Sequence, residues 1–173
     1  MKKCFLALLL ALCMLPALAL ASGSVLMVQL PQDAQMVENV EFDDGDFIQT
    51  YQLSGGATVQ LLRYASFEMT LGDLIASEWA GCTDVRELGV NAIGGCAAEG
   101  LRFAYQAEGQ AALDVTIVLV KTEGAVLVFE AVFPEALGDA QIEATVQAML
   151  ASMDVMDADD ADDAVGNETA EVG

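Results

Sequence analysis

The sequence predicts an α+β fold in which a mostly antiparallel sheet of about six strands is flanked by two main helices. Three observations carry this prediction. Short segments in which apolar and polar residues alternate recur along the chain, as half-buried strands require. Turns rich in glycine separate many of these segments, which is typical of hairpins. Two further segments repeat their apolar residues every three or four positions, which is the spacing of a helix that faces a core.

The strands are predicted from alternation and from the turn residues between them. Residues 24–30 form the first strand, which ends at Pro31, and residues 31–39 are expected to be a loop or one turn of helix. The extended segments that follow are 40–42, 47–53, 57–64, 82–88, 96–106, 113–122 and 125–133. The last two segments carry apolar residues on both faces, so they are expected to lie at the centre of the sheet and to be covered on both sides.

The helices are predicted from their caps and apolar stripes. Thr70 and Asp73 have the spacing of a capping box, and Gly81 is expected to end the helix that starts there. A second helix is expected over residues 139–153. The two stripes consist of Leu71, Leu74, Ile75 and Trp79, and of Ile142, Val146, Met149, Leu150 and Met153.

The first 21 residues have the composition of a signal peptide. Lys2 and Lys3 precede an apolar run over residues 4–15, and small residues follow up to a predicted cleavage site after Ala21. The run is shorter than the about 20 residues of a membrane-spanning helix, although an uncleaved anchor remains an alternative. The chain is therefore expected to be a bacterial protein that is secreted or periplasmic, with a single domain over residues 22–153 and no later membrane span.

The charge of the chain limits its partners. The sequence has 27 acidic residues against six lysines and arginines, and a formal net charge of −21. Such a protein repels phosphate backbones and anionic membrane surfaces, which argues against binding to nucleic acid. A solvated acidic surface is the simplest interpretation, and cationic partners are compatible with it.

Two cysteines, Cys82 and Cys96, lie outside the predicted signal peptide. A hairpin centred near Gly89 would place them opposite each other, and an exported protein favours a disulfide between them. Closing this short loop would stabilise the fold by about 3 kcal/mol. Two buried free thiols are the alternative.

Residues 154–173 form an acidic segment that is predicted to be a solvated tail. Its carboxylates are candidates for weak calcium binding, because calcium prefers oxygen ligands. The candidate ligands are Asp157, Asp159, Asp160, Asp162 and Asp163. Glu168 has the spacing of the last ligand of an EF-hand loop, but Ala161 replaces a ligand and Asp162 replaces the required glycine. No other cofactor is expected.

The sequence lacks the residues that common catalytic mechanisms need. It has no histidine, which excludes Ser-His-Asp and Cys-His catalysis as well as zinc held by histidine. No glycine-rich phosphate loop follows any predicted strand. A hydrolase that uses a pair of carboxylates remains an alternative, but nothing in the sequence selects a particular pair.

Four local features resemble the PsbP/Mog1-like α/β/α sandwich. They are Leu30-Pro31 after the first strand, residues 71–74 at the start of the first helix, residues 93–98 before a long strand, and residues 146–153 at the end of the fold. The resemblance covers residues 24–153 and implies a non-enzymatic accessory role. It transfers no functional residue, because fold alone does not give function.

The sequence as a whole favours an exported, non-enzymatic accessory or binding protein. Its partner is expected to be a protein or a component of the cell envelope. A calcium-binding protein that uses the acidic tail, and a carboxylate-dependent hydrolase, are the alternatives.

Overall fold

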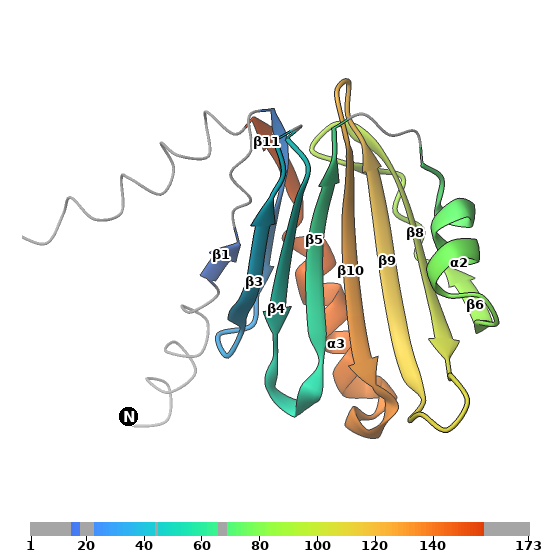
Figure 1. The fold of residues 1–173 in the computed structure, drawn as a ribbon. Helices are drawn as coiled ribbons and strands as arrows, with labels where there is room; N and C mark the ends of the chain where they lie inside the picture. Colours follow the sequence, from blue (N-terminus) through green and yellow to red (C-terminus); the bar gives the residue numbers. More distant parts are fainter. Residues whose placement is uncertain (1–14, 18–22, 44, 66–68, 158–173) are drawn as a thin grey trace, which may run out of the picture.

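An antiparallel sheet of eight strands carries the fold (Figure 1). The computed structural model describes residues 15–17, 23–43, 45–65 and 69–157. In spatial order the strands are β3 (Gln35–Glu41), β4 (Phe47–Gln52), β5 (Thr58–Tyr64), β10 (Val126–Pro134), β9 (Leu113–Lys121), β8 (Cys96–Tyr105) and β6 (Thr83–Glu87), with β7 (Ala92–Ile93) paired to β8. All the pairs are antiparallel. The predicted α+β class is therefore confirmed.

A helix and a second, smaller sheet cover one face of the large sheet. Strand β2 (Ser24–Leu30) lies between β1 (Leu15–Ala17) and β11 (Asp154–Asp157) in the small sheet. Helix α3 (Asp139–Ala151) packs beside β2 and contributes Ile142, Val146 and Met149 to the same core. Helix α2 (Leu71–Glu78) lies on the opposite face, where its apolar side chains cover β8, β9 and β10.

The two cores meet at the central strands, as their composition predicts. Ile117 and Val118 are neighbours in β9 and point to opposite faces, yet both are fully buried. The same holds for Val128 and Phe129 of β10. Strands that are covered on both sides read as continuous apolar runs rather than as an alternation, and this is the pattern of residues 113–133.

The predicted helix starts at its capping box. The hydroxyl of Thr70 accepts a hydrogen bond from the Asp73 amide at 3.1 Å, and the Asp73 carboxylate accepts one from the Thr70 amide at 3.2 Å. Without these bonds, the backbone amides of Thr70 and Asp73 would be donors without a partner at the helix N-terminus. Helix α2 ends at Glu78, which is slightly earlier than the Gly81 that the sequence predicts. None of the helices in the described part of the chain has the length and apolar character that a membrane crossing requires.

Three elements differ from the prediction. The large sheet has eight strands and not about six, since residues 35–39, which were expected to be in a loop, belong to strand β3, and residues 92–93 form the additional strand β7. Residues 154–157 belong to the fold as β11, although their composition places them in the acidic tail. Residues 15–17 lie inside the predicted signal peptide and pair with β2, whereas the rest of that segment and residues 158–173 fall outside the described residues.

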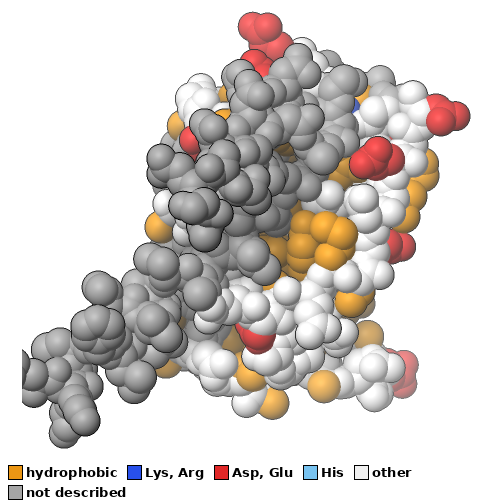
Figure 2. Space-filling view, turned by 90° about the vertical axis from the view of Figure 1, so that its left-hand side faces the viewer, with side chains coloured by type: hydrophobic (Ala, Val, Ile, Leu, Met, Phe, Trp, Pro, Cys, Tyr) orange, Lys and Arg blue, Asp and Glu red, His pale blue; other side chains and the backbone are white. Residues whose placement is uncertain are grey.

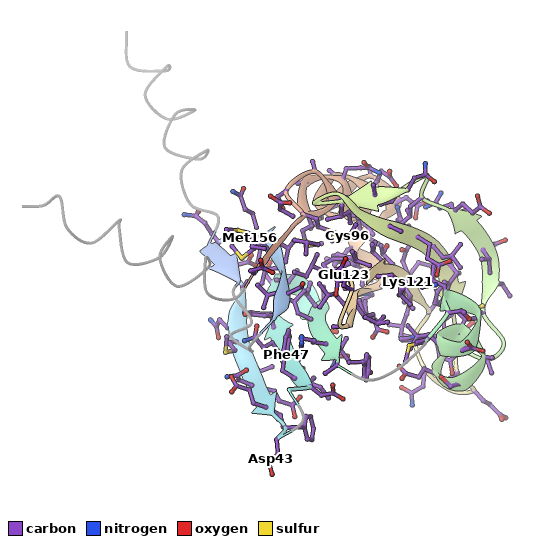
Figure 3. All side chains as sticks on the ribbon, turned by 90° about the horizontal axis from the view of Figure 1, so that it is seen from above. Asp43, Phe47, Cys96, Lys121, Glu123 and Met156 are labelled. Atoms are coloured by element: carbon purple, nitrogen blue, oxygen red, sulfur yellow. The ribbon has the colours of Figure 1, made fainter. Side chains whose placement is uncertain are left out.

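The predicted disulfide is not formed, since both Cys82 and Cys96 are free thiols. The strand register gives the reason. Thr83 pairs with Ala104 at one end of β8, whereas Cys96 pairs with Ile93 at the other end, across a turn at Gly94 and Gly95. Eight residues of strand span about 26 Å at 3.3 Å each, and a disulfide joins Cα atoms that are within about 7 Å. The two thiols also pack against different cores, and Figure 3 labels Cys96 on the α3 side.

The turn before β8 is held tightly against β11, and this contact can be tested. Gly94 has a φ of 54°, and a Cβ atom placed there would lie 2.5 Å from the backbone nitrogen of Val155. Gly95 has a φ of 78°, but a Cβ atom there would meet nothing within 4 Å. Gly94→Ala is therefore expected to lower the free energy of unfolding by about 1–2 kcal/mol more than Gly95→Ala. Urea denaturation of both variants measures the difference, and equal losses would contradict this packing.

Candidate functional site

The side of the large sheet that α2 occupies is covered only in part. The apolar residues of α2 pack over β8, β9 and β10. Figure 1 shows no helix in front of β3, β4 and β5, so their side chains on this face are not covered by a described helix. This uncovered face ends at β3, which is the last strand of the sheet in that direction.

Exposed apolar side chains are concentrated at this edge. Among the described residues, the exposed large hydrophobic side chains are Met36, Val37, Phe42 and Val85, with exposed fractions of 50%, 57%, 49% and 51%. The first three lie in β3 or directly after it, while Val85 lies in β6 at the opposite edge. Figure 2 looks onto the side of the molecule where β3 lies and shows hydrophobic side chains gathered beside acidic ones. Met36 and Val37 lie at the start of β3 and Phe42 directly after its end, so these exposed apolar side chains are spread along the edge strand.

Two rows of side chains run from β3 across the uncovered face. The strand register aligns Val40, Ile48 and Leu62 in an apolar row, and all three are half-buried. The same register aligns Glu38, Thr50, Gln60 and Glu130 in the neighbouring row, which we call the polar row. The edge strand is thus continuous with a mixed surface rather than with a closed core.

Hydrogen bonds connect three members of the polar row. The side-chain amide of Gln60 donates a hydrogen bond to the Thr50 hydroxyl at 3.2 Å, and this hydroxyl donates one to the Glu38 carboxylate at 3.1 Å. The chain of bonds fixes the orientation of Glu38, which would otherwise rotate freely on an edge strand. The carboxylate of Glu38 is therefore held on the uncovered face.

Glu130 lies at the other end of the polar row and is 7% exposed. Its carboxylate accepts a hydrogen bond from the Trp79 indole at 3.1 Å. Trp79 in turn contacts Phe103 and Tyr105 edge-on, with ring centroids 5.9 and 5.0 Å away. Burial raises the pKa of Glu130 to about 7, against the smaller lowering effect of the Trp79 hydrogen bond. This carboxyl group therefore changes charge near neutral pH, in a protein without histidine.

The largest of the described cavities, about 800 Å³, lies on the other face between β6, β8 and α3. The guanidinium of Arg102 lies at this cavity, and its side chain is only 2% exposed. It forms two hydrogen bonds with Asp114, at 2.6 and 2.8 Å, and a third with Glu143 of α3. The bond to Glu143 attaches α3 to β8, and the bonds to Asp114 join β8 to β9, so we interpret the cluster as structural.

The metal ligands that the sequence suggests are not brought together in the described residues. Asp157 is the last residue of β11 and pairs with Ser24 of β2. Asp159, Asp160, Asp162 and Asp163 lie outside the described residues. Within the described part, no group of three or more Asp, Glu, Cys or His side chains has the arrangement of a metal site.

Only a weak signal in the sequence indicates the β3 edge. Residues 40–42 are predicted to be extended, but residues 31–39 lack the alternation of a half-buried strand. Every residue of β3 except Val40 is exposed, so burial could not impose a pattern on its sequence. An acidic stretch that contains Met36, Val37 and Phe42 was the available signal.

Comparisons with known proteins find similarity to solved structures, but none to a protein family or to a curated sequence. No protein-family model matches the chain, and no curated protein matches it. Among solved structures, LpqN of Mycobacterium tuberculosis, a protein involved in cell envelope biogenesis, is 13% identical with a TM-score of 0.42 over 82% of this chain and 90% of LpqN. PA94 of Pseudomonas aeruginosa, a protein of unknown function, is 19% identical with a TM-score of 0.40 over 79% of this chain and 93% of PA94. Neither is named as a PsbP/Mog1-like protein, so that resemblance remains a prediction.

Proposed function

We propose that this chain is an exported, non-enzymatic accessory protein that binds a polypeptide partner through strand β3. The observation that supports the proposal is that three of the four exposed large hydrophobic side chains among the described residues, Met36, Val37 and Phe42, lie along one edge strand that borders an uncovered sheet face. Apolar side chains provide most of the favourable free energy of protein association. An open strand edge adds main-chain groups that can form hydrogen bonds to a partner.

The opposite edge of the sheet provides a comparison within the same molecule. Strand β6 has a register shift inside the strand, between Thr83 and Arg86, with a φ of 54° at Asp84. The register shift of β3 lies at its start, between Met36 and Glu38, and leaves four regular pairs after it. A bulge inside an edge strand interrupts the row of main-chain groups that a partner strand would need. Val85 is the single exposed large hydrophobic residue of β6, so we interpret this edge as protected.

The proposal can be tested by site-specific photocrosslinking in the native host. A photoreactive amino acid at Val37 is expected to yield an adduct with one partner protein, because this residue is exposed at the β3 edge. The same amino acid at Val85 is the matched control, since its exposed fraction is similar and it lies on the other edge strand. The adduct at Val37 should disappear in a Met36→Ser, Phe42→Ser background that retains the fold by circular dichroism. Adducts of equal yield at both positions, or at neither, would contradict the proposal.

A further inference from the structure

The exposed edge of β3 has the geometry of a site for strand addition. Among the described residues β3 pairs with β4 alone, and its pairing is regular from Glu38 to Glu41, opposite Thr50 to Phe47. No backbone hydrogen bond within the described chain reaches the other side of this regular segment. An extended peptide that adds to such an edge gains main-chain hydrogen bonds, and its alternate side chains provide specificity.

The charges around β3 determine which peptide fits. Between Pro31 and Leu62 the sequence has six acidic residues and no lysine or arginine. Glu38 and Glu41 are exposed on the strand itself, and exposed Asp43 follows it at the outer end of the β3–β4 connection, where Figure 3 labels it. A basic segment would be attracted to this edge and would approach it faster than a neutral one.

A second copy of the same chain is a poor occupant of this edge. Pairing β3 with β3 would bring Glu38 and Glu41 close to the same residues of the copy, and like charges on facing strands are destabilising. The formal net charge of −21 adds long-range repulsion between two copies. The acidic edge therefore disfavours self-association while leaving the main-chain groups open to a partner of opposite charge.

The two glutamates lie on opposite faces of the sheet, which restricts the partner further. Glu38 pairs with Thr50 on the uncovered face, and Glu41 pairs with Phe47, whose side chain is buried in the α3 core. Two basic residues on a partner strand reach Glu38 and Glu41 when they are three positions apart, because side chains alternate between faces. Val40 lies between them on the uncovered face, so an apolar residue is favoured opposite it.

We propose that β3 binds an extended polypeptide segment as an added strand, and that this segment carries two basic residues three positions apart with an apolar residue between them. This inference rests on the proposed function and specifies its partner. The binding energy comes from main-chain hydrogen bonds along Glu38–Glu41 and from apolar contacts with Met36, Val37 and Phe42. The two glutamates select the partner by charge.

The test is an NMR titration of the full chain with a capped peptide of sequence Thr-Val-Lys-Val-Thr-Lys-Val. We expect amide shifts concentrated in residues 36–42 and slower amide exchange in that segment, with no comparable change in β6. A peptide with glutamate in place of both lysines is expected to bind at least about tenfold more weakly. A peptide with N-methyl groups on alternate residues should also fail, because it cannot complete the main-chain hydrogen bonds.

A charge reversal provides the matched variant. The double variant Glu38→Lys, Glu41→Lys should prefer the glutamate peptide and lose the lysine peptide, with a fold that is unchanged by circular dichroism. Shifts spread over the whole surface, or equal binding of the N-methylated peptide, would overturn the strand-addition mode. Absence of lysine-peptide binding together with a Val37-specific crosslink would overturn the partner chemistry alone. Absence of both would overturn the proposed function as well.

Discussion

Replacing Asp114 by alanine is expected to lower the free energy of unfolding by about 3–5 kcal/mol, because it leaves a buried guanidinium without its main partner. The side chain of Arg102 is 2% exposed, and Asp114 accepts two of its hydrogen bonds at 2.6 and 2.8 Å. Glu143 would remain as the second carboxylate, but its side chain is 50% exposed and provides weaker compensation. Urea denaturation near neutral pH measures the loss.

An exposed ion pair of the same protein is the matched control. Lys121 and Glu99 lie 3.5 Å apart with side chains 49% and 45% exposed. Glu99→Ala is therefore expected to cost less than about 1 kcal/mol, since solvent screens exposed pairs. The double variant Arg102→Met, Asp114→Leu should recover much of the stability that Asp114→Ala loses, because apolar groups of similar volume often replace a buried ion pair without loss. If Asp114→Ala and Glu99→Ala cost the same, the guanidinium of Arg102 does not depend on Asp114 as its main buried partner.

The parts of the fold that burial determines were predictable from the sequence. The runs at 113–122 and 125–133 are apolar on both faces, and they become the central strands β9 and β10. The capping box at Thr70 starts α2 as expected, because local hydrogen bonds do not depend on the rest of the fold. In both cases the structure follows from residues close together in the sequence: burial of both strand faces gives a continuous apolar run, and the capping box joins residues three positions apart.

Features that depend on strand register were not predictable in this way. Cys82 and Cys96 were expected to pair because the hairpin was placed at Gly89, whereas the turn lies at Gly94 and Gly95. A shift of a few residues in one turn moves a cysteine to the other end of a strand, and alternation alone does not fix the register. The burial of Arg102 was missed for the same reason, since only the packing of α3 over β8 shows that its face is covered.

The candidate site also combines features that the sequence indicates with features that only the fold reveals. Strand β3 is exposed along nearly its whole length, so no alternation reveals it, and its pairing with β4 appears only in the structure. Glu130 is the one charged residue inside the apolar segment 126–133, and that contrast was a signal for a special role. Its partner Trp79 is 51 positions away in the sequence, so the interaction itself required the fold.

Replacing Glu130 by glutamine is expected to stabilise the protein at alkaline pH and to have little effect at acidic pH. Burial raises the pKa of Glu130 to about 7 in the folded state, against 4.5 for the unperturbed group. Between these two values the folded protein binds more protons than the unfolded chain, so this residue makes stability fall as the pH rises. The destabilisation is complete above about pH 7 and amounts to about 3 kcal/mol, at 1.36 kcal/mol for each pKa unit. Glutamine retains an oxygen that can accept the Trp79 hydrogen bond and carries no charge.

The measurement is the difference between the free energies of unfolding of Glu130→Gln and the unsubstituted protein, taken from urea denaturation at several pH values. Using the difference removes the titration of the other carboxylates, which both proteins share. The variant should gain about 2–3 kcal/mol near pH 8 and close to nothing near pH 4. Glu78→Gln is the matched control, because Glu78 is an exposed carboxylate that raises the pKa of Glu130 only as a smaller, coulombic contribution. A difference that stays constant across this range would mean that the pKa of Glu130 is the same in the folded protein as in the unfolded chain, and that the hydrogen bond from the Trp79 indole offsets the cost of burying its charge.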